Sequence, residues 1–239
     1  MKRLFFLSIF SFLLGVGLFF ATEPYRNRST LAKVVEKSMT GSKGEYGIVI
    51  KHLKTGETYS VNEHRVFDSG SLYKLWVMAE AFSQIKEGRL KKDDVLSQNI
   101  EVLNTKFSTA SNEAELKEGH IEMIVSQAIT QMITISHNYA ALLLADKIKN
   151  SEITGFLESE GFKNSSLGSA SDVPRSTAAD IALFYEKLYK GEIVDKDASR
   201  EMLEILKKQK LNDGLPRLLS KDVAVAHKTG DIGWFKHDG

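Results

Sequence analysis

Residues 70–82 read GSLYKLWVMAEAF, and the rest of the chain is interpreted from this stretch. Its apolar side chains recur at the spacing of one helix face, and they are Leu72, Leu75, Trp76, Ala79 and Phe82. We therefore predict a helix that is rooted in the core. Ser71 and Lys74 lie in its first turn, three residues apart, and this spacing brings their Cβ atoms to about 5–6 Å on one side of a helix.

The Ser71 hydroxyl and the Lys74 amine can therefore form a pair of nucleophile and base. Gly70 permits a sharp turn into the helix and leaves the Ser71 N–H without an intrahelical acceptor. An ordinary helix start is the alternative, because the same spacing occurs again at Ser83 and Lys86. Ser83 would lie inside the helix, where a hydroxyl usually bonds to the carbonyl one turn earlier.

The composition excludes several classes of function. The 239 residues carry 32 Lys and Arg against 31 Asp and Glu, and this balance gives no indication of a nucleic-acid surface. The absence of cysteine excludes disulfides and thiolate zinc sites, and the six histidines show no ligand spacing. We therefore expect no metal and no organic cofactor.

The first 22 residues are expected to direct the protein out of the cytoplasm. Lys2 and Arg3 precede an uncharged, mostly apolar run over residues 4–21, which is typical of a signal peptide or an N-terminal membrane anchor. The sequence FFAT at 19–22 is a poor cleavage site, so both alternatives stay open. The functional domain would then span residues 30–239 in the periplasm or outside the cell, with any anchor's basic end inside.

Helical patterns alternate with a few short strands along the rest of the chain. We predict a hairpin of strands 46–50 and 58–61 that turns at Gly56, and a strand over residues 223–227. Helices are expected over 31–39, over 121–149 with an interruption at 134–138, over 153–160, from 177, and from 197 or 199. This mixture without βαβ alternation predicts an α/β fold of the α+β kind.

Ser136 and Asn138 are polar residues in the interruption of an otherwise apolar stretch. A buried hydroxyl or amide without a partner costs about 1–3 kcal/mol on mutational scales. These residues therefore need either a partner or a function. A helix N-cap at Ser136 is an equally acceptable explanation of this segment taken alone.

Three motifs follow one another in the chain: Ser71-x-x-Lys74, Ser136-x-Asn138 and Lys228-Thr229-Gly230. In this order and in these local settings they resemble the motifs of class A β-lactamases and related penicillin-binding serine enzymes. The resemblance runs from about residue 44 to the end and includes RSTAADIAL at 175–183. A second Lys-Thr-Gly, at 54–56, lies in the predicted hairpin turn and precedes the serine, so it does not fit.

The resemblance implies a β-lactamase/transpeptidase-like fold, with an antiparallel sheet flanked by helices and an all-helical lobe. It also implies that Ser71 attacks a β-lactam amide or a D-alanyl peptide and forms an acyl-enzyme. Lys74 can be the base only if its pKa falls from about 10.4 towards 7. Burial and the charge of Lys228 both act in that direction.

The remaining roles are likewise implied by the resemblance. Ser136 would pass a proton to the leaving nitrogen, and Asn138 would bind the side-chain amide of the substrate. Lys228 and Thr229 would bind the substrate carboxylate. Gly230 would let the substrate lie close to the strand, while the N–H groups of Ser71 and Asp231 would form the oxyanion hole.

Three features depart from the family pattern. His137 stands where the family usually has aspartate, and no glutamate lies between residues 163 and 177, where the family carries its deacylating base. Asp172 is the only carboxylate in that loop and so the only candidate there for a part in deacylation, but turn formation before Pro174 explains it better. The chain also ends nine residues after Gly230, so we expect an incomplete sequence whose third motif has lost its sheet neighbours.

We therefore expect an exported, class A-like serine β-lactamase that acts on β-lactams and confers antibiotic resistance as a monomer. Loss of a positioned base typically slows a reaction by about 10²–10⁴-fold, so deacylation could be slow. One alternative is a penicillin-binding D-alanyl-D-alanine peptidase that acts on peptidoglycan peptides. The other is a binding module that recognises β-lactams and has lost deacylation.

Overall fold

The computed structural model describes residues 30–108, 114–168 and 172–239. The predicted signal or anchor segment, residues 1–22, lies outside these ranges. Among the described helices, none combines the length and the apolar character needed to cross a bilayer.

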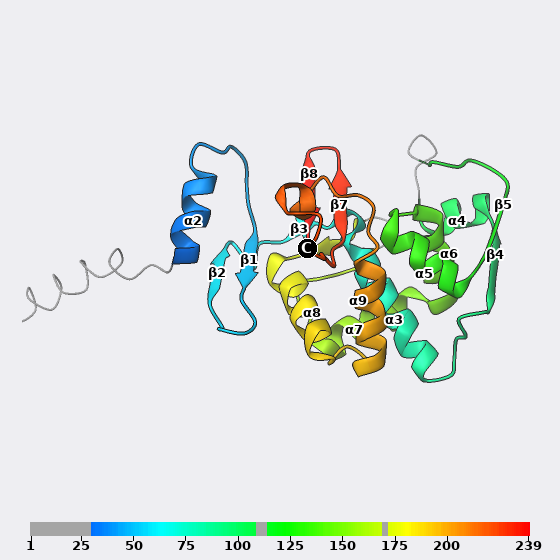
Figure 1. Cartoon of the computed structure of the whole chain (residues 1–239). Coiled ribbons are helices and arrows are strands. Elements are labelled where there is room, and N and C mark those ends of the chain that lie inside the picture. The colour runs from blue at the N-terminus through cyan, green and yellow to red at the C-terminus, as the bar shows by residue number, and fades with distance from the viewer. Residues whose placement is uncertain (1–29, 109–113, 169–171) are drawn as a thin grey trace, which may run out of the picture.

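Helices are grouped around α3, and short strand pairs lie on several sides of this helical body (Figure 1). The helices are α2 (Thr30–Met39), α3 (Lys74–Lys86), α4 (Ile100–Lys106), α5 (Val125–Thr134), α6 (Asn138–Ile148), α7 (Asn150–Glu160), α8 (Ala178–Lys190) and α9 (Lys196–Leu206), with 3₁₀ turns η1 (Gly70–Tyr73) and η2 (Leu215–Leu218). The strands are β1 (Ile48–Lys51), β2 (Thr58–Val61), β3 (Phe67–Asp68), β4 (Val95–Asn99), β5 (His120–Ile124), β6 (Arg175–Ser176), β7 (Thr229–Ile232) and β8 (Phe235–Asp238).

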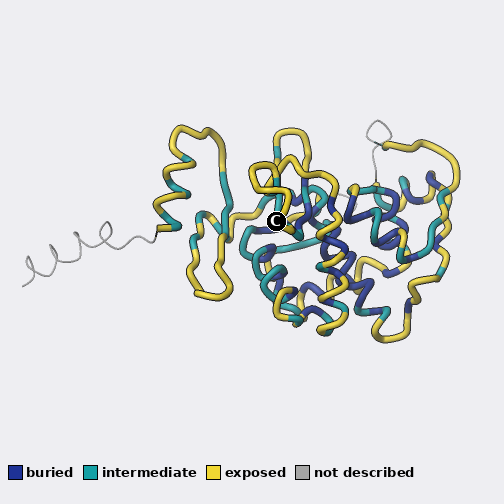
Figure 2. Tube along the Cα trace, viewed as in Figure 1, coloured by how far each residue is buried: buried dark blue, intermediate teal, exposed yellow. Residues whose placement is uncertain are grey.

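The predicted central helix is confirmed as α3, which is buried on almost every side, but its predicted first turn is the 3₁₀ turn η1, and α3 itself begins at Lys74. All five residues of the predicted apolar stripe, Leu72 in η1 and the other four in α3, are buried, and Leu75, Trp76 and Ala79 are fully covered. The helix contacts α5, α6, α7 and α9. Figure 2 shows the buried residues concentrated in this helical body, whereas α2 and the β1–β2 hairpin are mostly exposed or intermediate.

Aromatic rings fill the core around Trp76. The Trp76 ring centroid lies 4.8 Å from that of Phe162 and 5.3 Å from that of Phe184. These contacts join α3 to α8 and to the segment after α7, and they fix α3 as the frame on which the candidate site is built.

The α+β fold class is confirmed, but the strands do not form one continuous sheet. The described strands form separate antiparallel pairs, which are β1–β2, β3–β6, β4–β5 and β7–β8. The expectation that the Lys-Thr-Gly strand has lost its neighbours is wrong, because β7 pairs with β8 along its whole length. The hairpin at Gly56 is confirmed, and this glycine has a φ of 76°.

Several predicted boundaries differ from the structure. Residues 121–124, expected as helix, belong to β5 and pair with β4. Residues 223–227, expected as a strand, have no ladder partner within the described chain, and β7 begins only at Thr229. The helix after Val194 begins at Lys196, one residue before the earlier predicted start, because the Asp195 side chain accepts from the N–H groups of Asp197 and Ala198.

Two glycines allow β7 to pack against the turn that carries Ser71. A Cβ atom at Gly230 would lie 2.7 Å from the Ser69 carbonyl oxygen and 3.2 Å from Leu72 Cγ. Gly70 has a φ of 50°, and a Cβ atom there would lie 2.9 Å from Ile232 Cγ1. The close approach of η1 and β7 therefore depends on both positions.

We predict that Gly230→Ala lowers the free energy of unfolding by about 1–3 kcal/mol, because the added methyl group overpacks the contact between β7 and η1. Urea unfolding followed by circular dichroism measures this change. Gly155→Ala is the matched control, since a Cβ atom there meets nothing within 4 Å in the middle of α7. The control should keep or raise stability, and equal stability of Gly230→Ala and the parent chain would contradict the packing argument.

Candidate active site

Lys74 lies at the start of α3 with its side chain buried and directed at the α5–α6 junction. Its Nζ donates to the Ser136 carbonyl oxygen at 2.6 Å, to Ser136 Oγ at 3.1 Å and to Asn138 Oδ1 at 2.6 Å. These three acceptors match the three N–H donors of an ammonium group. Ser136 and Asn138 were expected to need hydrogen-bond partners, and both accept hydrogen bonds from Lys74.

Lys228 also reaches the Ser136 hydroxyl. Its Nζ lies 3.0 Å from Ser136 Oγ and donates to the Thr229 carbonyl oxygen at 2.7 Å. Both lysines have a relative exposure of 0%. The structure therefore brings one residue of each motif, namely Lys74, Ser136 and Lys228, into a single cluster.

Burial lowers the pKa values of both amines. The pKa of Lys74 falls to about 7, first because of burial and then because of the charge of Lys228, while Glu115 opposes the shift. Burial lowers the pKa of Lys228 to about 8, and Asp238 opposes that shift. A buried amine with a pKa near neutrality is suited to general base catalysis.

Ser71 lies within η1, and its side chain is half-buried. No hydrogen-bond partner of Ser71 Oγ is found among the described residues, and the Lys74 amine is occupied by Ser136 and Asn138 instead. The direct hydrogen bond between Ser71 and Lys74 is thus not formed in this state. A neutral Lys74 would donate only two protons, so one acceptor would be released and a lone pair would become available.

The two backbone N–H groups predicted to form the oxyanion hole are both free of secondary-structure bonds. Ser71 is the second residue of a helical turn, where the N–H has no intrahelical acceptor. Lys228 and Gly239 form a hydrogen-bonded pair, in which each N–H donates to the carbonyl oxygen of the other residue. Hydrogen-bonded and non-hydrogen-bonded pairs alternate along an antiparallel ladder, so Asp231 and Lys236 form a non-hydrogen-bonded pair. The Asp231 N–H therefore points away from β8. The turn η1, which carries Ser71, contacts β7.

Gly230 and Thr229 occupy different settings in β7. Gly230 is buried against Ser69 and Leu72, so the structure explains this glycine by packing between strand and helical turn. Its predicted role in close approach of the substrate is not needed to account for it. Thr229 is only half-buried, and its backbone carbonyl holds Lys228.

The His137 side chain caps the start of α6. Its Nδ1 accepts from the Ala140 N–H at 3.3 Å, so it is the N-cap of this helix. Ser136 is therefore not the cap, and it adopts a φ of 58°, a left-handed conformation that is unfavourable for a residue with a Cβ atom. The histidine thus supports the strained turn that presents Ser136 to both lysines.

Asp172 is held within its own loop. Its Oδ1 accepts from the Val173 N–H at 3.1 Å and lies 2.9 Å from an Arg175 guanidinium nitrogen. No contact joins Asp172 to the described residues of the lysine cluster. Turn formation therefore explains Asp172, whereas its predicted part in deacylation has no supporting geometry.

Glu115 is the residue of this site that sequence reasoning missed. Its Oε1 accepts from Asn138 Nδ2 at 2.5 Å. Glu115 belongs to no periodic element and lies 23 positions before Asn138. No sequence signal could have identified it, because the contact exists only through the tertiary fold.

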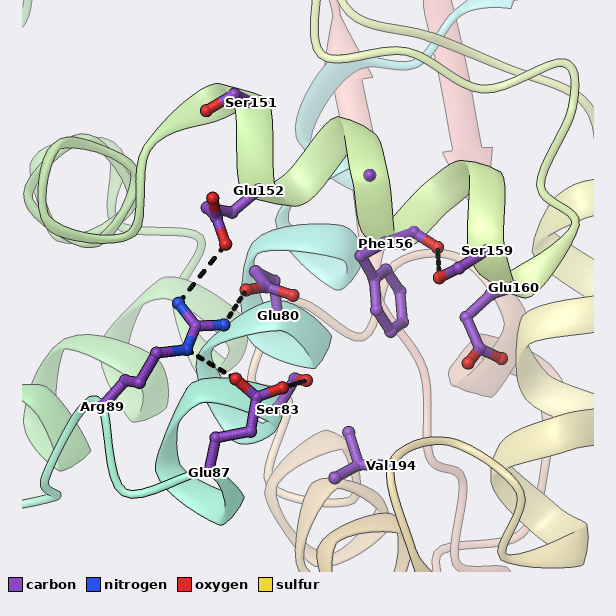
Figure 3. Close-up of a pocket in the computed structure, with 11 residues that line it drawn as sticks. Glu80, Ser83, Glu87, Arg89, Ser151, Glu152, Phe156, Ser159, Glu160 and Val194 are labelled. Carbon is purple, nitrogen blue, oxygen red and sulfur yellow. Dashed lines mark hydrogen bonds and ion pairs between the residues drawn. The ribbon is translucent and has the colours of Figure 1, made fainter.

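The second Ser-x-x-Lys copy has a different setting. Ser83 lines a polar pocket between α3 and α7, where it donates to Glu87, while three carboxylates surround Arg89 (Figure 3). Lys86 is paired with Asp195 at 2.6 Å. Within the described ranges, no group of three or more His, Asp or Glu side chains is placed to hold a metal ion.

Comparison with known proteins places this geometry in context. The profile described as "Beta-lactamase enzyme family" matches residues 29–239. The structure is similar to that of PBP-A, at 23% identity and a TM-score of 0.76, with 90% of this chain and 82% of that chain covered. No curated protein matches at a significant level.

Two further solved structures are similar. A PBP-A variant in an acyl-enzyme complex with penicillin G has 22% identity and a TM-score of 0.75, covering 90% of this chain and 82% of that chain. An ancestral class A β-lactamase has 22% identity and a TM-score of 0.72, covering 87% and 84%. At these identities, the likeness establishes a common fold.

We predict that Lys74 titrates near pH 7 in the free protein and that Lys228→Met raises this pKa, because removal of a nearby positive charge favours the ammonium form. Nuclear magnetic resonance of ¹³C-labelled lysine side chains measures the titration directly. Lys86→Met is the control and should leave the Lys74 pKa unchanged, since Lys86 pairs with Asp195 on the surface. Titration of Lys74 together with the exposed lysines near 10.4 would contradict the account.

Proposed function

The chain belongs to the β-lactamase enzyme family and is a hydrolase that acts on β-lactams, and from this premise we propose that it opens the lactam amide through an acyl-enzyme on Ser71. One observation carries the proposal. The Ser136 hydroxyl lies within 3.1 Å of Lys74 Nζ and 3.0 Å of Lys228 Nζ, and both amines have lowered pKa values. One lysine can therefore be neutral while the other is charged.

Acylation would use the neutral form of Lys74. Ser71 Oγ forms a bond to the lactam carbonyl carbon, and its proton passes to the Lys74 amine. The negative charge that develops on the carbonyl oxygen would be stabilised by the N–H groups of Ser71 and Asp231. The C–N bond then breaks, and the leaving nitrogen receives a proton through Ser136.

Substrate binding would use the charged form of Lys228. This ammonium attracts the carboxylate of the β-lactam, and the half-buried Thr229 lies next to it in the chain. Asn138 has a second N–H that can donate to the side-chain carbonyl of the substrate. The protein's own residues thus provide binding and acylation.

Deacylation is where a second candidate function arises. Residues 163–177 contain no glutamate, and Asp172 is paired with Arg175. The structure of a PBP-A variant, which has a similar fold, was solved as an acyl-enzyme complex with penicillin G. These observations favour a slowly deacylating penicillin binder or a D-alanyl-D-alanine peptidase as the alternative to a fast β-lactamase.

The first experiment asks where penicillin attaches. Intact-protein mass spectrometry after addition of benzylpenicillin should show an adduct on the parent chain, and Ser71→Ala should abolish it. Ser83→Ala is the matched control and should retain the adduct, because Ser83 lies in the separate pocket of Figure 3. An adduct that survives Ser71→Ala would disprove the assignment.

The lifetime of the same adduct separates the two candidate functions. A transient adduct with accumulating penicilloate would identify a working β-lactamase. An adduct that persists would identify a penicillin binder or peptidase, as expected if no loop residue activates water.

Export from the cytoplasm also remains part of the proposal. Lys2 and Arg3 followed by the apolar run of residues 4–21 support it. Cell fractionation with a tagged full chain should find the protein outside the cytoplasm, and replacement of the apolar run by polar residues should retain it inside. A cytoplasmic parent chain would refute export.

A further inference from the structure

The segment that carries Glu115 is fixed to the start of α6. The Leu116 N–H donates to the Tyr139 hydroxyl at 3.2 Å, and the Leu116 carbonyl oxygen accepts from Asn104 Nδ2 at 2.9 Å. Tyr139 is 2% exposed and follows Asn138 directly in the chain. Both polar backbone atoms of Leu116 are therefore bound, and Glu115 is held beside Asn138.

The Asn138 amide can adopt only one orientation between its two neighbours. Lys74 is a donor at 2.6 Å, so it must face the Oδ1 atom. The Glu115 carboxylate is an acceptor at 2.5 Å, so it must face the Nδ2 atom. Glu115 thus fixes the Asn138 amide, and one Nδ2 proton remains for another acceptor.

Glu115 also brings a negative charge to this side of the site. Its side chain is exposed, and no lysine or arginine forms an ion pair with it among the described residues. Its charge reaches the site itself, because Glu115 raises the pKa of Lys74 against the effect of burial. A substrate side chain held by Asn138 would therefore lie next to a carboxylate.

We infer that Glu115 is a specificity-determining residue that favours substrates with a cationic amine beside the side-chain amide and disfavours those with a carboxylate there. This inference rests on the proposed function, since Asn138 must hold the side chain of an acylating substrate. The Coulomb interaction of Glu115 with a charge on the substrate side chain is attractive for an ammonium and repulsive for a carboxylate. The attraction of an ammonium and the repulsion of a carboxylate together should change the preference by about tenfold or more.

The test uses three penicillins that differ only in the substituent on the side-chain α carbon. Benzylpenicillin carries hydrogen, ampicillin carries an ammonium group and carbenicillin carries a carboxylate. Acylation rate constants of the full chain are measured for each at a pH where the ampicillin amine is charged. The ampicillin-to-carbenicillin ratio of acylation rate constants should fall about tenfold in Glu115→Gln. This ratio is the readout, because Glu115 also affects Lys74 and Asn138 and so can change the rate for all three penicillins together.

Glu118→Gln is the matched control, because Glu118 is an exposed carboxylate on the same segment. Its ratio should stay within about twofold of the parent value. A second measurement needs no variant. The ampicillin-to-carbenicillin ratio of acylation rate constants for the parent chain should fall as salt is added, because salt screens exposed charges.

The outcomes separate the inference from the function on which it rests. Acylation with an equal ratio in the parent chain and Glu115→Gln, insensitive to salt, overturns the role of Glu115 and leaves the proposed function intact. Absence of acylation by all three penicillins overturns the proposed function, and the inference with it. An equal fall of the ratio in both variants would show a general charge effect and overturn the specific role of Glu115.

Discussion

The arrangement of two buried lysine amines around one hydroxyl is the constraint on which the rest of the site depends. Lys74 and Lys228 both lie within hydrogen-bond distance of Ser136 Oγ, and both are fully buried. Two like charges removed from water cannot both be stable there, so the cluster favours a state in which one amine is neutral. That state is the one in which a lysine can take a proton from a serine.

Packing interactions elsewhere in the fold offset the free-energy cost of burying this cluster. Aromatic packing around Trp76 fixes α3, and α3 positions Lys74. The glycine contact between β7 and η1 sets the distance between the Lys228 strand and the Ser71 turn. His137 caps α6 and so maintains the strained turn at Ser136. Rigid packing thus maintains an arrangement that isolated side chains would avoid.

The sequence predicted the parts of this arrangement that depend on local rules. The apolar stripe of the central helix, the glycine of the first hairpin and the helix start expected at residue 177, where Thr177 is the N-cap of α8, all follow from spacing or capping chemistry. Residues 121–124 were misassigned because a short apolar run does not distinguish strand from helix. The expected strand at 223–227 has no ladder partner among the described residues, and Glu115 reaches Asn138 only through the fold. These tertiary relations have no local signal.

The most direct test of the account is the pH dependence of the acylation rate constant. Lys74 acts as the neutral amine, which is present above its pKa, so the rate should rise through about pH 7. Lys228 acts as the ammonium, which is present below its pKa, so the rate should fall above about pH 8. A bell-shaped profile with these two limbs, which belong to the coupled pair, is the predicted result. A rate that continues to rise towards the ordinary lysine pKa of about 10.4 would contradict the two-lysine account.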